Sequence, residues 1–399
     1  MNREDFPILK NNIIYFDNGA TTLKPKCVID ATSDYYSNYS SNAHRGDYKI
    51  SLKASSEYEK VREKVKDFIN ANTKEEIVFT SGATESLNMI VFGFFMDKLK
   101  EDDEVLITKA EHASNILPWY ELENKKNIKV NYIPLTEDHI VTLDNVINSI
   151  TDKTKVISLA HITNVIGDIR PIKEIIKYAH KRGILVVVDA AQSIGHTLVD
   201  VKDLDADFLA FSAHKMLGPT AVGVLYGKYD LLDQLKPYKY GGGMNVAFAS
   251  PKEIEYMELP YKLEAGTQNI AGVIGFGKAI DYINEIGVDN IEEYVIDLKE
   301  YLVNRLKEIE NIKIYNENIE GATVTFNMDN IFSQDVAIYL DKYNICVRSG
   351  SHCAKKLEDE IGIKNTVRVS LYFYNTKEDI DKLVEALKSD KILEESIGV

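Results

Sequence analysis

The chain has 399 residues, with 47 basic against 62 acidic side chains and a formal net charge of −15. This acidic balance argues against non-specific binding to nucleic acid, and the length is enough for two or three domains. Residues 1–12 lack an apolar stretch, which indicates neither a signal peptide nor a membrane span. We therefore expect a cytoplasmic protein without a nucleic-acid or membrane partner.

Strand-like and helix-like segments alternate along the first part of the chain. Residues 76–80 are β-rich, and a turn at 81–84 leads into an apolar helical pattern that reaches about residue 95. Further strand candidates are 103–108, 128–134, 155–161, 184–188, 208–211 and 221–226, and a helix is expected at 171–182. The unbroken apolar run at 184–188 is typical of a parallel strand buried on both faces. The alternation predicts an α/β fold with a mostly parallel central sheet and helices on both faces.

The pattern changes after the glycines at 241–243. A helix is expected from about residue 268, and two long helices are expected at 288–310 and 377–389. Short strands are expected between them, at 322–327, 345–348 and 367–371. This mixture favours a smaller α+β domain at the C-terminal end.

Two charged residues stand where strands of the central sheet end. Asp189 follows five apolar residues, and a buried carboxylate needs a cation or strong donors. It is either a helix cap or the partner of a protonated pyridine nitrogen, which would make the ring an electron sink. Lys215 follows another strand; it is either an ordinary surface lysine or, if desolvated, an amine of lowered pKa that can form a Schiff base.

Thr80–Ser86 follows a strand and opens a helix, so its amides and hydroxyls suit a phosphate, although plain helix capping explains the pattern as well. His112 also follows a strand. Taken alone it is a structural histidine, but beside Asp189 and Lys215 it could stack over a flat ring and transfer a proton.

The three cysteines lie in different surroundings. Cys353 lies in a polar turn with several cations nearby, and cations favour the reactive thiolate. We expect Cys27 and Cys346 to belong to the core. The cations around Cys353 are Arg348, His352, Lys355 and Lys356. We do not take His352 as its base, because consecutive side chains of an extended segment point opposite ways. No ligand spacing accompanies these residues, so no metal site is predicted.

Arg368 lies within a strand-like run at 366–370. It is either exposed at a sheet edge, or it faces a cleft and binds a carboxylate through its planar fork.

In this order, the motifs resemble the class V aminotransferase family of pyridoxal-phosphate (PLP) enzymes of fold type I. Within that family the chain is similar to the Suf-type (group II) cysteine desulfurases, also called the selenocysteine lyase group. The most specific motifs are 42–46 (NAHRG), 80–86, 110–112 (AEH), 188–193 (VDAAQS), 212–215 (SAHK), 264–267 (EAGT) and 348–353 (RSGSHC). The resemblance implies three parts: an N-terminal arm (1–21) packed on the small domain, a large PLP-binding domain (22–275), and a small domain (276–399) with the catalytic cysteine loop.

The resemblance also implies roles for individual residues. Lys215 would carry PLP, Asp189 would pair with its pyridine nitrogen, and His112 would stack on its ring. The other implied cofactor contacts are Gln192 at the phenolic oxygen, Asn164, and Ala83, Thr84, Ser212 and His214 at the phosphate, with Thr267 from a second subunit. The implied substrate contacts are Asn164, Arg368, Arg348 and His44, and Cys353 would take the sulfur.

The implied activity is conversion of L-cysteine to L-alanine in a homodimer, with a persulfide on Cys353 and sulfur transfer to an acceptor protein, as in iron–sulfur cluster assembly. The alternatives are a selenocysteine lyase, another class V enzyme such as an aminotransferase or cysteine lyase, and a non-catalytic sulfur-trafficking module. Two positions depart from the group: Ser351 stands where a second histidine is common, and Asp47–Lys49 replaces a more apolar or histidine-containing stretch.

Overall fold

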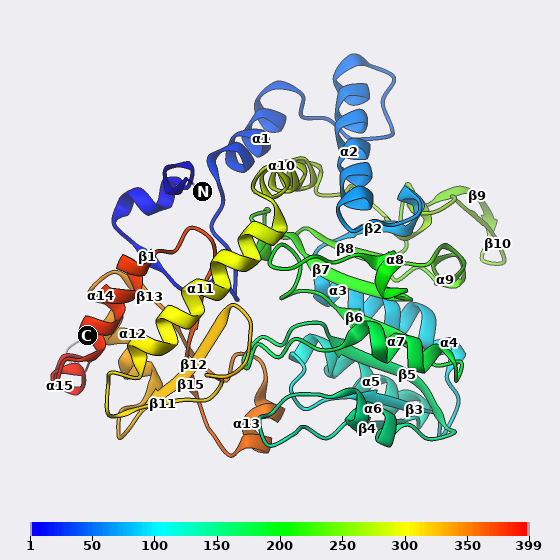
Figure 1. Cartoon of the computed structure of the whole chain (residues 1–399). Helices are drawn as coiled ribbons and strands as arrows, with labels where there is room; N and C mark the ends of the chain where they lie inside the picture. The colour runs from blue at the N-terminus through cyan, green and yellow to red at the C-terminus, as the bar shows by residue number, and fades with distance from the viewer. Residues whose placement is uncertain (1, 397–399) are drawn as a thin grey trace.

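The computed structural model describes residues 2–396 and is built around a seven-stranded sheet (Figure 1). In spatial order the strands are β2 (Ile77–Thr80), β8 (Gly223–Gly227), β7 (Phe208–Ser212), β6 (Leu185–Asp189), β5 (Thr154–Ala160), β3 (Glu104–Ile107) and β4 (Lys129–Tyr132). Only β8 runs antiparallel to its neighbours in this sheet, so the expected mostly parallel sheet is confirmed.

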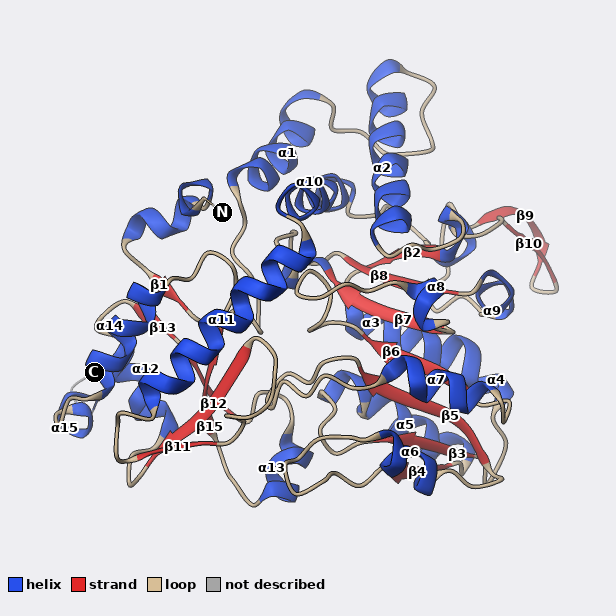
Figure 2. Cartoon of the chain, viewed as in Figure 1, coloured by secondary structure: helices blue, strands red, loops and turns tan. Residues whose placement is uncertain are grey.

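Helices cover both faces of this sheet, as Figure 2 shows. The alternating side chains of β6 explain why: Val186 and Val188 pack in one apolar cluster with α7, whereas Val187 packs in another with α3 and α5. The helices of this part are α1 (Lys26–Asn38), α2 (Lys49–Phe68), α3 (Ala83–Asn88), α4 (Met96–Lys98), α5 (Leu117–Lys126), α6 (Leu143–Ser149), α7 (Ile172–His180), α8 (Val201–Leu204) and α9 (Tyr229–Gln234). The run expected to 95 is helical, but it widens into a π-helix at Met89–Phe95 between α3 and α4.

A second, smaller sheet is antiparallel, in the order β11 (Ile312–Ile314), β12 (Thr323–Met328), β15 (Thr366–Ser370) and β14 (Arg348–Gly350). Its helices are α11 (Val288–Leu306), α12 (Ser333–Asp341), α13 (Lys355–Ile361), α14 (Lys377–Leu387) and α15 (Ile392–Ser396). The strand expected at 345–348 is divided into β13 (Ile345–Cys346) and β14, and the long helix ends at Leu306 rather than at 310.

Two segments connect these parts. β1 (Ile14–Tyr15) pairs in parallel with β13, so the N-terminal segment lies against the smaller sheet. Helix α10 (Ile270–Ile286) begins two residues later than expected and continues unbroken through 275 and 276. The predicted division of the chain into parts at 1–21, 22–275 and 276–399 therefore stays a prediction. A two-stranded hairpin, β9 (Asn245–Ser250) with β10 (Glu253–Tyr256), projects from the body of the molecule (Figure 1).

Candidate active site

A cavity of about 290 Å³ lies where the carboxyl ends of β5, β6 and β7 meet the smaller sheet. This is the edge at which α/β sheets bind ligands. The cavity brings together twelve of the fourteen residues predicted for the site. These are Ala83, Thr84, His112, Asn164, Asp189, Gln192, Ser212, His214, Lys215, Arg348, Cys353 and Arg368.

Asp189 and Lys215 both line the cavity. Asp189 is 5% exposed, and its Oδ1 accepts a hydrogen bond from Ala191 N at 3.0 Å. Burial raises the pKa of Asp189 to about 6, and burial lowers the pKa of Lys215 to about 8 against the opposing attraction of Asp189. A buried carboxylate in need of a cation therefore faces an amine that is readily deprotonated.

His112 contributes a flat, neutral ring. Its Nδ1 lies 3.1 Å from the Ser114 amide, and burial, with Lys215 and Arg368 nearby, lowers its pKa to about 4. A neutral imidazole can stack on an aromatic ligand without paying for the burial of a charge.

A buried ion pair that the sequence interpretation missed supports this ring. Glu111 and Arg170 are both fully buried and bonded to each other. Glu111 Oε2 also accepts from Ala160 N at 2.7 Å, so the carboxylate ties the loop that carries His112 to the end of β5. The amide of Arg170 donates to His161 O at 3.0 Å, which joins the two ends of the loop that carries Asn164. The only sequence signal was a charged residue inside the AEH motif.

The turn before α3 forms one end of the cavity. Gly82 has a φ of +155°, and a Cβ at Gly223 would lie 2.3 Å from its Cα, so both positions require glycine. The amide of Ala83 donates to Ser212 Oγ at 2.8 Å, which joins the helix start to the end of β7. The free backbone amides at a helix start suit an anion.

The cysteine loop is a tight turn, as expected, but the extended backbone that was assumed in setting His352 aside as a base is wrong. His352 and Cys353 both adopt left-handed backbone conformations, with φ of +52° and +57°. The ring of His352 bonds Thr366 Oγ1 at 2.9 Å through Nε2, and burial lowers its pKa to about 3. The His352 ring is thus hydrogen-bonded to β15 of the smaller sheet.

Two hydrogen bonds attach this loop to the large sheet. Ala113 N donates to Cys353 O at 2.9 Å, and Asn164 Nδ2 donates to His352 O at 2.7 Å. Cys353 is exposed at the cavity, beside the loop of His112.

Cys27 and Cys346 were expected to belong to the core, and this expectation is wrong. Cys27 is exposed, because it lies on the outer face of the first turn of α1, where Val28 is the buried residue. Cys346 is half-buried in the two-residue strand β13. Exposure alone therefore does not distinguish Cys353, but its place in the cavity does.

Arg368 is 2% exposed, which excludes an exposed sheet edge. It lies on β15, inside the four-stranded sheet, and its Nη1 donates to Asn164 O at 2.9 Å. Arg348 also lines the cavity, but Asp17 accepts both of its side-on donors, Nε and Nη2, at 2.9 Å.

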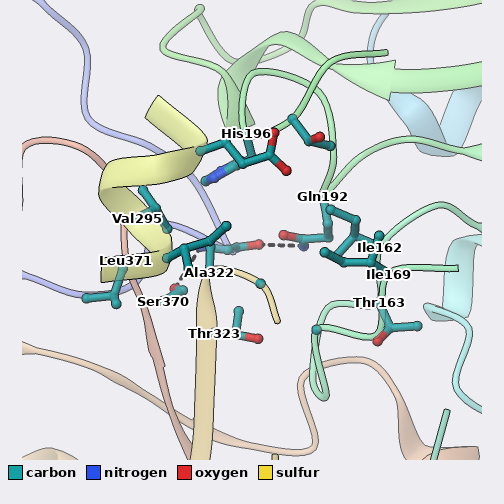
Figure 3. A pocket seen from close by; sticks show the side chains of 16 residues that line it. Ile162, Thr163, Ile169, Gln192, His196, Val295, Ala322, Thr323, Ser370 and Leu371 are labelled. Atoms are coloured by element: carbon teal, nitrogen blue, oxygen red, sulfur yellow. Dashed lines mark hydrogen bonds between the residues drawn. The ribbon is translucent and has the colours of Figure 1, made fainter. Parts of the chain in front are cut away.

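Gln192 lines both this cavity and a smaller, second pocket. That second pocket, of about 30 Å³, lies between α11 and the loop at 162–169, and Figure 3 shows Gln192 among the side chains that line it. Its Nε2 donates to Gly19 O at 2.9 Å. That pocket has room for water rather than for a substrate.

Thr267 and His44 do not line the cavity. Thr267 is exposed, and His44 pairs with Glu59 at 3.3 Å in a separate hollow of about 370 Å³. Gly266 and Gln268, on either side of Thr267, line the same hollow. The two residues are thus near each other but apart from the other twelve.

An amine, a buried carboxylate, a neutral histidine and a thiol around one cavity define an enzyme that acts on a small molecule. The sequence profile of the family described as aminotransferase class-V matches residues 14–383, and the chain belongs to this family.

The chain is similar to several named proteins and to solved structures. It is 42% identical to a probable cysteine desulfurase of Halalkalibacterium halodurans, over 97% of this chain and 96% of that one. It is 38% identical to a cysteine desulfurase of Haloferax volcanii, over 98% and 96%. The apo structure of a cysteine desulfurase from Thermococcus onnurineus superposes with a TM-score of 0.92 at 38% identity, covering 100% of this chain and 98% of that one.

Proposed function

We propose that this chain is a PLP-dependent cysteine desulfurase that converts L-cysteine to L-alanine and keeps the sulfur as a persulfide on Cys353. The observation that carries the proposal is the shared cavity: the Cys353 turn is bonded to the loop after His112 and lines the same space as Lys215 and Asp189. A class V enzyme of another activity would not need a thiol there.

The residues present fit PLP. The buried Asp189 carboxylate supplies the anion that a protonated pyridine nitrogen needs, and Thr84 at the start of α3 lines the cavity where a phosphate would lie. Lys215 would hold the aldehyde carbon, His112 would cover the ring, and Gln192 would reach the phenolic oxygen. Ser212, His214 and Thr84 would surround the phosphate. When bound, PLP would act as the electron sink for the substrate carbon.

The remaining residues orient the amino acid and receive the sulfur. Arg368 and Asn164 would hold the carboxylate, which places the substrate thiol toward Cys353. Lys215 would take the proton from Cα and return a proton to the carbon skeleton, where the electron pair of the broken carbon–sulfur bond stays on Cβ and Cβ is protonated to the methyl group of alanine. The Cys353 thiolate would form a bond to the substrate sulfur, the carbon–sulfur bond would break, and L-alanine would leave. The sulfur would then pass to an acceptor protein of the cytoplasm, in iron–sulfur cluster assembly.

Product analysis tests this proposal. The PLP-loaded protein should release L-alanine from L-cysteine and, with a reductant present, an equal amount of sulfide. Parallel incubation with L-selenocysteine separates a selenocysteine lyase, which would act on that substrate alone. An aminotransferase would need an added keto acid and would form no sulfide, and a trafficking module would release no alanine.

We expect Asp189→Asn to lose most of the turnover while still binding PLP. Asparagine fills the same space but carries no charge to hold the pyridine nitrogen protonated. A fall of more than a hundredfold in kcat is expected, about 2.7 kcal/mol of barrier. The absorbance spectrum of the bound cofactor reports its protonation independently of turnover. A variant within tenfold of the parent would show that this carboxylate does not tune the ring.

We further propose a homodimer. The β9–β10 hairpin exposes apolar side chains, with Val246 61% and Phe248 74% exposed, although such residues favour burial. Light scattering should give twice the 45.1 kDa of one chain. Phe248→Ser should weaken association, while Phe332→Ser, at a 53% exposed phenylalanine far from the hairpin, should not. A fully active monomer would contradict this arrangement.

None of the helices within residues 2–396 combines the length and apolar character that a membrane span requires.

A further inference from the structure

Two arginines lie directly opposite each other on neighbouring strands. Arg348 of β14 and Arg368 of β15 are register partners in the small sheet. Like charges in opposite positions destabilise a sheet, so the pair needs a compensating anion. Asp17 supplies it, because its carboxylate bonds Arg348 at 2.9 Å and Arg368 Nη2 at 3.2 Å.

The backbone fixes Asp17 in this position. Phe16 O accepts from Ser370 N at 2.7 Å, and Gly19 N donates to Ser370 Oγ at 2.8 Å, so the residues on both sides of Asp17 are bonded to the end of β15. A Cβ on Gly19 would lie 3.1 Å from the Arg368 guanidinium carbon, so the chain passes closely over that group. Asp17 itself is 16% exposed. The Arg348 side chain is 45% exposed, so the backbone around Asp17, rather than burial of both partners, fixes this ion pair.

The two arginines differ in the donors that they have left. Arg348 gives both side-on donors to Asp17. Arg368 gives Nη1 to Asn164 O and Nη2 to Asp17, but its Nε is buried and has no hydrogen-bond partner among residues 2–396. Both guanidinium groups therefore keep N–H donors beside the cavity, but the charge of Arg348 is paired with Asp17 through its Nε and Nη2, whereas Arg368 keeps a buried Nε without a partner among residues 2–396.

We infer that Asp17 is a specificity-determining residue that neutralises Arg348, so that the three side chains leave one net positive charge for a ligand carboxylate and disfavour a second anionic group. A dicarboxylate bound to Arg368 would place its second charge near the Asp17 carboxylate and find the Nε and Nη2 side of Arg348 already paired. This inference rests on the proposed function only in assigning the substrate carboxylate to Arg368.

Binding of two simple acids tests the inference without turnover. Propionate and succinate differ by one carboxylate, and neither has an amine that could displace Lys215. Their affinities for the PLP-loaded protein can be measured by NMR titration. In Asp17→Asn the freed Arg348 should tighten succinate at least tenfold, while propionate should change less than threefold. The double variant Asp17→Asn/Arg348→Gln should lose the gain for succinate.

Asp5→Asn is the matched control, because Asp5 lies in the same N-terminal segment but bonds Tyr282 rather than an arginine. Equal gains for succinate and propionate, or a gain no larger than in Asp5→Asn, would overturn the inference. If Asp17→Asn does not fold, Arg348→Gln alone should weaken both acids threefold or more, because Asp17 then faces Arg368 alone; unchanged or tighter binding would refute it. Release of alanine from L-cysteine by the parent is a separate measurement, so either proposal can fail alone.

Discussion

Lys215→Ala is expected to abolish both the covalent attachment of PLP and all detectable turnover. The amine lies in the cavity that holds Asp189, and burial lowers its pKa to about 8, so a useful fraction is unprotonated near neutral pH. Alanine leaves nothing to attach the cofactor, and the visible band of the Lys215–PLP adduct should disappear. Borohydride reduction, digestion and mass spectrometry of the parent should place the adduct on Lys215.

The control for this change is Lys355→Ala, which removes an exposed lysine from the first turn of α13, close to the cysteine loop. It should keep the visible band and PLP attachment. Thermal unfolding of the PLP-free proteins should show that Lys215→Ala remains folded, because Asp189, which loses the attraction of Lys215, keeps its hydrogen bond from Ala191 N and can take up a proton. Recovery of the reduced adduct on any other lysine would remove the proposed role of Lys215.

Cys353→Ser is expected to keep the bound cofactor but to lose release of alanine from L-cysteine by a thousandfold or more, about 4 kcal/mol of barrier. The serine hydroxyl has the size of the thiol but is not ionised near neutral pH, so it cannot take the sulfur. The left-handed turn and its bonds to Ala113 N and Asn164 Nδ2 involve the backbone, and the variant should keep them. Selenocysteine turnover is expected to decline less, because selenium leaves more readily without a nucleophile.

The chain offers matched controls for this thiol. Cys27→Ser removes the other exposed thiol and Cys346→Ser the half-buried one, and both should keep the parent rate. Alkylation after brief exposure to L-cysteine, followed by peptide mass analysis, should find one extra sulfur on the Cys353 peptide only. Alanine formation from L-cysteine by Cys353→Ser at the parent rate would show that Cys353 does not receive the sulfur.

The sequence by itself determined the central sheet and the ends of its strands. The unbroken apolar run at 184–188 is typical of a parallel strand buried on both faces, so the place of Asp189 followed from the residues before it. Lys215 was located in the same way, after the apolar strand at 208–211. Because carboxyl ends of parallel strands share one edge, chain order alone brought these two residues together. Their chemical roles came from the resemblance to a family.

Only the tertiary structure decided which distant groups meet. Asp17 and Arg348 are 331 positions apart. No local sequence pattern indicates that a carboxylate near the N-terminus accepts hydrogen bonds from an arginine of β14. The pairing of Glu111 with Arg170 and the turn of His352 toward Thr366 likewise depend on loops from different strands. Hydrophobic periodicity indicates which face of an element is buried, because the apolar residues that mark this face all lie within that element. A polar contact depends on the partner as well, and the packing of the two sheets supplies that partner.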